Sequence, residues 1–149
     1  MTEVLFYHLQ HLPLERVLPN LLEKSIERGW RVVVQAGSSE RVNALDTLLW
    51  TYREDSFLPH GTSKDARAEV QPVYLTSNMD NPNGATVRFL VDGADLDAFK
   101  DYERIVYIFN GNDENAVQAA RDSWRRARDA NCTVTYWKQD ANGRWERKA

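Results

Sequence analysis

The order of apolar and amphipathic segments constrains the fold of this chain more than any other feature. Short apolar runs suited to buried strands lie at 4–9, 30–37, 72–76, 85–93 and 103–111. Segments with a helical spacing of apolar residues lie at 13–28, 38–50 and 112–131. Strands that alternate with helices in this way are typical of a layered α/β domain built on a mostly parallel sheet. The sequence therefore predicts an α/β fold.

Residues that favour helix ends mark several boundaries. Because proline is tolerated in the first turn of a helix, we expect the first helix to begin at Pro19, and Gly29 is a natural stop. Ser38 is a suitable N-cap for the second helix. Asp113 and Glu114 lie in the first turn of the last helix, where carboxylates satisfy the positive end of the helix dipole.

The chain also contains one long irregular segment and one clear hairpin signal. Residues 52–71 mix turn formers with charges, so we expect a long loop there, and loops of this length are often functional. Asn142-Gly143 is the strongest short signal for a hairpin. It predicts that the strand after residue 131 turns back within a C-terminal extension at 139–149.

Length and composition favour a single domain over residues 1–149. No apolar run approaches the roughly 20 residues that span a bilayer, and the first residues lack a signal-peptide pattern, so we expect a cytoplasmic protein with no membrane contact. Cys132 is the single cysteine, which excludes an internal disulfide and a cysteine-rich zinc site.

Motifs for catalysis or cofactor binding are absent from the sequence. The strand-to-helix turns at 35–41 and 109–115 contain neither G-x-G-x-x-G nor a Walker motif. His8, His11 and His60 lack the spacing of metal ligands, and no G-x-S-x-G marks a serine nucleophile. We therefore expect no catalytic residue, no metal and no cofactor.

The segment AARDSWRRARDA at 119–130 is unusual in a chain with a net charge of -3. On a helical wheel the apolar stripe contains Ala116, Val117, Ala120, Trp124 and Ala127. Next to it lie Arg121, Arg125 and Arg128, while Arg126 is expected on the far side. Arginine forks bind carboxylates and a tryptophan at the border offers an apolar notch, which indicates a site for an acidic, aromatic partner.

A structural interpretation of the same segment stays open, in which Asp122 and Asp129 pair with neighbouring arginines and Trp124 only packs in the core. A similar choice holds for Trp50 and Phe57. These two side chains either cover the core beneath the long loop or anchor a protein partner.

The chain resembles a known family, the chi subunit of bacterial DNA polymerase III, over about residues 1–138. The matching residues are Phe6-Tyr7, Gly29-x-Arg31-Val32, Leu45-Asp46-x-x-Leu49-Trp50, Ser56-Phe57-x-Pro59-His60, Pro72-Val73, Arg121-x-x-Trp124-Arg125 and Trp137-Lys138. The resemblance implies a three-layer Rossmann-like fold, no catalytic activity and an adaptor role. Its partners would be the acidic C-terminal tail of single-stranded-DNA-binding protein and the psi subunit of the clamp loader.

The resemblance also implies roles for individual residues. The tail site would consist of Val117, Arg121, Trp124, Arg125 and Arg128. Val117 stands where relatives carry a lysine, so one cation is missing and Arg128 would compensate. The surface for psi, or for an equivalent clamp-loader or helicase partner, would consist of Trp50, Phe57, Pro59 and His60.

These inferences favour a non-catalytic adaptor that contacts DNA only indirectly. The alternative is a nucleotide-binding or nucleotide-processing enzyme, because an α/β fold supports both functions. Direct binding of a single strand is less favoured, since the sequence shows no basic stripe along which a strand could bind.

Overall fold

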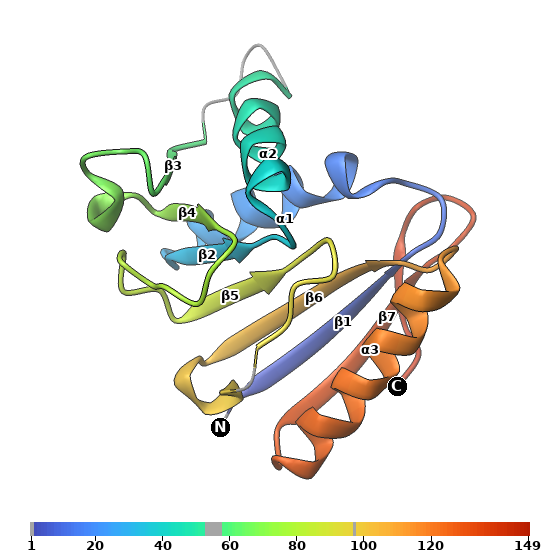
Figure 1. Cartoon of the computed structure of the whole chain (residues 1–149). Helices are drawn as coiled ribbons and strands as arrows, with labels where there is room; N and C mark the ends of the chain where they lie inside the picture. Colours follow the sequence, from blue (N-terminus) through green and yellow to red (C-terminus); the bar gives the residue numbers. More distant parts are fainter. Residues whose placement is uncertain (1, 53–57, 97) are drawn as a thin grey trace.

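The computed structural model describes residues 2–52, 58–96 and 98–149 (Figure 1). The strands are β1 (Glu3–Leu9), β2 (Val32–Gln35), β3 (His60–Thr62), β4 (Val73–Thr76), β5 (Val87–Leu90), β6 (Arg104–Asn110), β7 (Thr133–Gln139) and β8 (Trp145–Arg147). The helices are α1 (Leu14–Glu27), α2 (Ser39–Thr51) and α3 (Glu114–Asp129), with short 3-10 turns at Ala68–Val70 and Phe99–Asp101.

The described strands form one sheet in the order β3-β4-β2-β5-β6-β1-β7-β8. Neighbouring strands are parallel except for the antiparallel pair β7 and β8. Helices α1 and α2 lie on one face of the sheet and α3 lies on the other (Figure 1). The predicted three-layer α/β fold with a mostly parallel sheet and a C-terminal hairpin is therefore confirmed.

The sheet carries an apolar core on each face because successive side chains of a strand point to opposite sides. On the α1 side, Tyr7 and Leu9 of β1 pack with the apolar residues of α1 and α2. On the α3 side, Val4 and Phe6 pack with Ala120 and other residues of α3. Each helix layer is thus held by a separate cluster of buried side chains.

The predicted start of the first helix is wrong. Helix α1 begins at Leu14, and Pro19 lies inside it. Proline removes one backbone donor and normally disfavours an interior position. Here the first turn is kept by burial, because Leu14, Val17 and Leu18 all lie in the core. Tertiary packing therefore outweighs the local cost of the proline.

The predicted long loop at 52–71 is wrong in part, because strand β3 and the turn at Ala68–Val70 lie within it. The sequence His60-Gly61-Thr62 has no apolar pattern, and the strand exists because its backbone pairs with β4. The carboxylate of Asp65 fixes its end by accepting a 2.7 Å hydrogen bond from the Thr62 backbone N–H.

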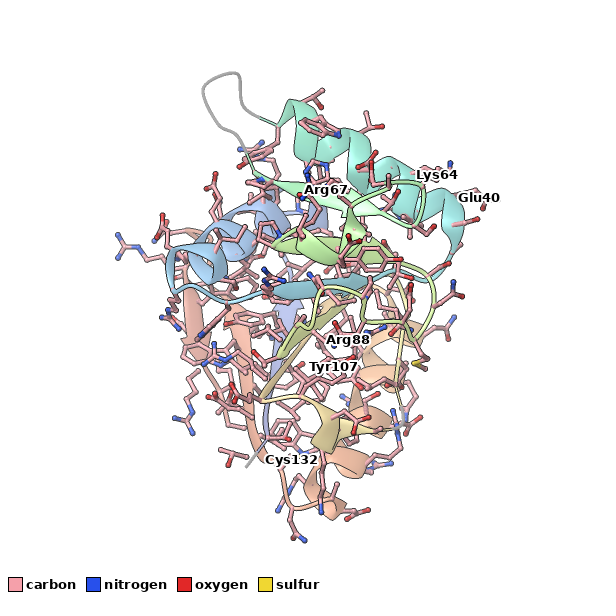
Figure 2. The ribbon with its side chains drawn as sticks, turned by 90° about the vertical axis from the view of Figure 1, so that its left-hand side faces the viewer. Glu40, Lys64, Arg67, Arg88, Tyr107 and Cys132 are labelled. Atoms are coloured by element: carbon pink, nitrogen blue, oxygen red, sulfur yellow. The ribbon has the colours of Figure 1, made fainter. Side chains whose placement is uncertain are left out.

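A buried arginine ties the middle of the sheet together. Arg88 of β5 has no exposed surface and lies inside the domain (Figure 2). Its guanidinium donates two hydrogen bonds to Gln35 Oε1 on β2, at 3.0 and 2.7 Å. It also donates to the backbone oxygens of Asn78 and Asp80 and to the Tyr102 hydroxyl. The charge is therefore held by five hydrogen bonds that cross strands and loops.

The C-terminal hairpin follows the predicted turn. The Asp140 carboxylate accepts hydrogen bonds from the backbone N–H groups of Asn142 and Arg144, at 2.8 and 2.9 Å. Gly143 has a φ of 79°, which glycine adopts at little cost. Among the residues that the structure describes, no helix is both long and apolar enough to cross a bilayer.

Candidate functional site

Helix α3 carries all five residues that the sequence assigns to a tail site. The helix is capped as predicted, since the Asp113 side chain accepts hydrogen bonds from the backbone N–H groups of Asn115 and Ala116. Val117 and Trp124 are half-buried, whereas Arg121, Arg125 and Arg128 are exposed. The arginines therefore face solvent beside a partly covered tryptophan.

The buried face of α3 is rotated from the predicted one. Ala120, Ser123 and Ala127 are buried, so the packed face is centred near Ala127 and includes Ser123, whereas Val117 and Trp124 are half-buried at its border. At about 100° per residue, Trp124 then lies on one flank of that face and Arg126 on the other. The placement of Arg126 on the far side is wrong.

The Arg126 side chain is bound by residues of the loop before β6. Its guanidinium pairs with the Asp95 carboxylate and donates a 3.1 Å hydrogen bond to the Leu96 backbone oxygen. Burial alone would raise the pKa of Asp95, but hydrogen bonds from Tyr107, Arg126 and Ser123 outweigh burial and lower this pKa. Of the four arginines at 121–128, Arg126 therefore has a structural role.

An aromatic cluster supports the other flank of α3. The Trp124 ring centroid lies 5.6 Å from that of Phe6 and 5.9 Å from that of Tyr136, at interplanar angles of 57° and 70°. The Tyr136 hydroxyl and His8 Nδ1 share a 2.6 Å hydrogen bond, and the Phe109 ring is 5.2 Å from the His8 ring. Trp124 is thus fixed by rings from β1 and β7, and Phe109 of β6 packs against Tyr136 behind them.

Arg121 lies close to this aromatic cluster. Burial raises the pKa of the Tyr136 hydroxyl, and the positive charge of Arg121 opposes that shift. Arg125 lies further round the helix, with its side chain 71% exposed and 3.6 Å from the Asp122 carboxylate. We define the arginine ridge as Arg121, Arg125 and Arg128. By helical geometry, Arg121 and Arg128 are its members nearest to Trp124.

A second predicted surface lies where α2 meets β3. Trp50 is 55% exposed, and its ring centroid lies 4.6 Å from that of His60. His60 is buried, with Nδ1 2.7 Å from the Leu58 backbone oxygen and Nε2 3.1 Å from the Asp46 carboxylate. Pro59 is half-buried, and Phe57 lies outside the described residues. Trp50 therefore offers the contact area, and His60 supports it from below.

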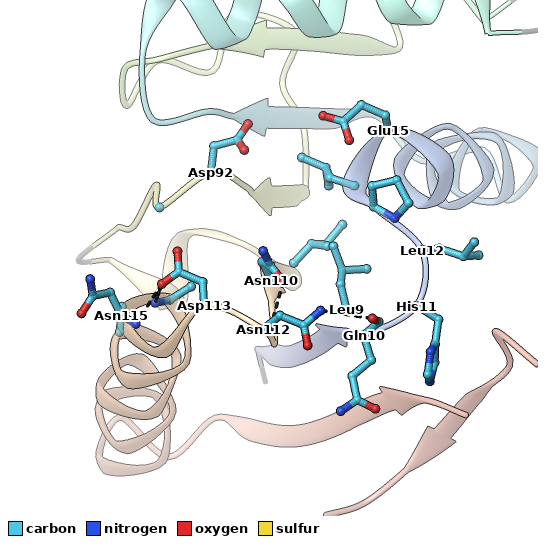
Figure 3. A pocket seen from close by; sticks show the side chains of 16 residues that line it. Leu9, Gln10, His11, Leu12, Glu15, Asp92, Asn110, Asn112, Asp113 and Asn115 are labelled. Atoms are coloured by element: carbon cyan, nitrogen blue, oxygen red, sulfur yellow. Dashed lines mark hydrogen bonds between the residues drawn. The ribbon is translucent and has the colours of Figure 1, made fainter. Parts of the chain in front are cut away.

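A crevice of about 760 Å³ lies at the carboxyl ends of β1 and β6 (Figure 3). Helices α1 and α3 leave these neighbouring strands toward opposite faces, which is where α/β folds commonly bind nucleotides. The crevice is lined by the carboxylates of Glu15, Asp92 and Asp113, and no lysine or arginine occurs among its described lining residues. The described lining therefore provides no cationic side chain that could bind a phosphate group.

Metal and thiol chemistry receive no support from the geometry. Within the described ranges, no group of three or more histidine, cysteine or acidic side chains could hold a metal ion. His8 is engaged with Tyr136, and His11 is exposed. Cys132 is half-buried against the α3-side core, and burial raises the pKa of its thiol, which keeps it protonated and poorly nucleophilic.

Comparison with known proteins gives the family. The model of the DNA polymerase III chi subunit family, HolC, matches residues 1–135. The chain belongs to this family. It is also 26% identical over 109 residues to a probable DNA polymerase III subunit chi of Rickettsia prowazekii (strain Madrid E). That match covers 73% of this chain and 66% of the relative, just under two thirds of its length.

The supporting residues of this chi-family protein were not identified by sequence reasoning. His8, Phe109 and Tyr136 come from three strands, and they meet because β1 pairs in register with both β6 and β7. The alternation of side chains along each strand could have placed them on one face. It could not have placed them beside Trp124, because strand order and register are not visible in the sequence.

Proposed function

We propose that this chain is a non-catalytic adaptor of the DNA polymerase III holoenzyme. In this proposal it binds the acidic C-terminal tail of single-stranded-DNA-binding protein and links that protein to the clamp loader during replication. The observation that carries the proposal is the arginine ridge beside Trp124, a ring packed against Phe6 of β1 and Tyr136 of β7. In this proposal the chain contacts DNA only indirectly, through the bound protein. We expect the chain to act in the cytoplasm.

The chemistry of the ridge suits an acidic peptide with a terminal aromatic residue. Arg121 and Arg128 are exposed and lie on either side of Trp124, so their guanidinium forks can bind carboxylates of the tail. The aromatic residue of the tail would pack between Trp124 and Val117, which are both half-buried. Binding sites of this type combine a rigid aromatic anchor with charged groups at the rim.

The three arginines of the ridge are not equivalent in this proposal. Arg125 faces away from the packed side of α3 and lies 3.6 Å from the Asp122 carboxylate. Arg121 lies close enough to Tyr136 for its charge to affect that hydroxyl. We therefore assign the main contact with the tail to Arg121, a second contact to Arg128, and a minor one to Arg125.

The opposite end of the domain would receive a second partner. Trp50 is a large exposed apolar side chain that His60 supports, and Pro59 and Phe57 follow nearby in the chain. Exposed tryptophans are enriched among residues that dominate protein interfaces. We assign this surface to the psi subunit or to an equivalent clamp-loader or helicase partner.

The enzyme alternative has weaker support. A nucleotide would need cations or free backbone donors at the crevice of Figure 3, but carboxylates line it. The first backbone N–H groups of α3 are already bound by Asp113. Glu15 and Asp92 are both paired with Arg41, at 3.1 and 2.9 Å, so the charges there are already matched.

The tail site is tested by fluorescence polarisation with a labelled tail peptide. Arg121→Ala should weaken binding at least tenfold, because one charge-assisted hydrogen bond contributes about 1.5–3 kcal/mol. Arg125→Ala should weaken binding by less than about threefold, since its side chain is mostly exposed and partly paired. Arg16→Ala, which removes an exposed arginine from α1, is the matched control.

If the Arg121→Ala and Arg16→Ala proteins bind the tail peptide with equal affinity, the assignment of the tail site to α3 is wrong. A peptide that ends in an amide in place of the carboxylate gives a second measure. If Arg121 binds that carboxylate, the wild type should bind the amidated peptide more weakly than the unmodified one. The Arg121→Ala protein should bind the two peptides with similar affinity. A pull-down with Trp50→Ala should retain the tail and lose the second partner.

A further inference from the structure

A second site rich in aromatic rings and cations lies on the α1 face of the sheet. It is a cavity of about 240 Å³ next to the end of α1, with lining side chains from five strands as well as the helix. Five of its lining residues are aromatic: Phe89 is buried at the base, and the other four are Tyr7, Trp30, Trp137 and Trp145. All four are half-buried, so each ring keeps part of its surface open to a ligand.

The rings of this cavity form a platform. Tyr7 and Trp137 are paired residues on β1 and β7, and their ring centroids lie 6.3 Å apart at an interplanar angle of 18°. The Trp145 ring, from β8, meets the Tyr7 ring edge-on at 4.8 Å and 75°. Two nearly parallel rings bordered by an edge-on ring suit a flat aromatic ligand that packs against them.

The cations of the cavity lie beside the rings. The guanidinium carbons of Arg28 and Arg104 lie 5.0 and 4.8 Å from the Trp30 ring centroid, and Lys24 is one turn before Arg28 on α1. Arg104 is also paired with Glu3 at 3.0 Å, whereas Lys24 and Arg28 are exposed. Among the described residues that line the cavity, none carries a carboxylate.

We propose that this cavity binds one nucleotide unit, with the base packed against the rings of Tyr7, Trp137 and Trp145 and the phosphate bound by Lys24 and Arg28. Aromatic platforms beside cations are the chemistry by which proteins bind single-stranded nucleic acids with little sequence preference. A phosphate uses several cations at once, whereas a peptide carboxylate needs one. The unit could belong to single-stranded DNA or to a free nucleotide.

This site is separate from the tail site and does not rest on it. The two sites use opposite faces of the sheet, and Trp137 and Trp145 lie beyond residue 135, where the match to the family model ends. Two of the cations come from the end of α1, at residues 24 and 28, and the third comes from residue 104, far away in the sequence. The lack of a basic stripe in the sequence therefore does not exclude a local site for a single strand.

The test measures binding of a fluorescent thymidine oligomer of about 10 nucleotides, a length within the range that one single-strand-binding module covers. Trp145→Ala should weaken binding at least fivefold, the change that corresponds to a stacking contribution of about 1 kcal/mol. Trp145→Phe keeps a ring and should retain most of the affinity. Circular dichroism of each variant verifies that the domain is folded.

The salt dependence of binding tests the cations. Arg28→Ala should reduce the slope of log affinity against log salt concentration by about 0.7, the value for one lost phosphate contact on a single strand. Arg16→Ala removes the same charge from an exposed position of the same helix and should leave the slope unchanged. Thymidine monophosphate in a parallel titration distinguishes the two sources of the nucleotide unit.

Binding of the oligomer or of the free nucleotide supports the proposal only where Trp145→Ala and Arg28→Ala weaken it. The proposal is overturned if neither probe binds at millimolar concentration, or if the two variants bind as the wild type does. An acidic peptide that binds in this cavity when neither nucleotide probe does would also overturn it. Failure here leaves the tail-peptide titration unaffected, so the two proposals are tested separately.

Discussion

The two faces of the sheet carry sites of similar composition that are built in different ways. On the α3 face, Trp124 and the arginine ridge all come from one helix. On the α1 face, the rings and cations of the cavity come from six elements. A site on one helix can be read from residue spacing, whereas a site assembled from several strands needs the register of the sheet. Sequence reasoning could therefore propose the first site but not the second.

The largest expected effect comes from removing the buried arginine in the middle of the sheet. Arg88→Met should lower the free energy of unfolding by about 3 kcal/mol, because Gln35 and the other buried acceptors lose their donor. Urea denaturation measures this change. Arg67→Met alters an exposed arginine and should stay within about 0.5 kcal/mol of the wild type. An equally small effect of Arg88→Met would show that the network is replaceable by apolar packing.

The next largest effect is the stability that is lost when a tryptophan is removed from either face. Trp124→Ala should cost about 2 kcal/mol of stability, since its ring packs on Phe6 and Tyr136 in the middle of the α3 layer. Trp145→Ala should cost about 1 kcal/mol, because it lies on the three-residue edge strand β8. The same urea titrations measure both. Equal costs would mean that the hairpin is as integral to the core as α3 is.

The smallest expected effect is a pH dependence of the stability that Asp95 contributes on the α3 face. The pKa of Asp95 is lowered in the folded state, so its contribution to stability is present above the ordinary value of about 4. That contribution is lost as the pH falls through the lower folded value. Asp95→Asn should therefore be less stable than the wild type near neutral pH and nearly equal to it in acid.

Urea midpoints at about pH 7 and about pH 3 measure this difference. Asp122→Asn, which alters a carboxyl on α3 whose side chain is 60% exposed, is the matched control and should change little at either pH. A gap between the wild type and Asp95→Asn that stays constant with pH would assign the role of Asp95 to packing rather than to its charge.

Local signals predicted those parts of the fold that local chemistry decides. Ser38 caps α2 and Asp113 caps α3 through side-chain hydrogen bonds, as expected for these residue types. Asn142-Gly143 forms the predicted turn. Each of these features depends on a few neighbouring residues, which is why their types are sufficient to predict them.

The remaining features depend on contacts that are distant in sequence. The start of α1 at Leu14 is decided by core packing, and β3 is decided by its pairing with β4. The position of Arg126 is decided by Asp95, which lies 31 residues earlier in the chain. For the same reason, the helical wheel predicted three arginines that the structure shows to be exposed but placed the centre of the buried face too close to Trp124.

The short strands at both edges of the sheet affect how partners can bind. The sheet ends in β3 on one side and in β8 on the other, each three residues long, and β8 is followed by the charged side chain of Lys148. Short, charged edges discourage the addition of a strand from another chain. Both proposed ligands would accordingly be recognised by side chains on the two broad faces, so point mutations there should separate one interaction from the other.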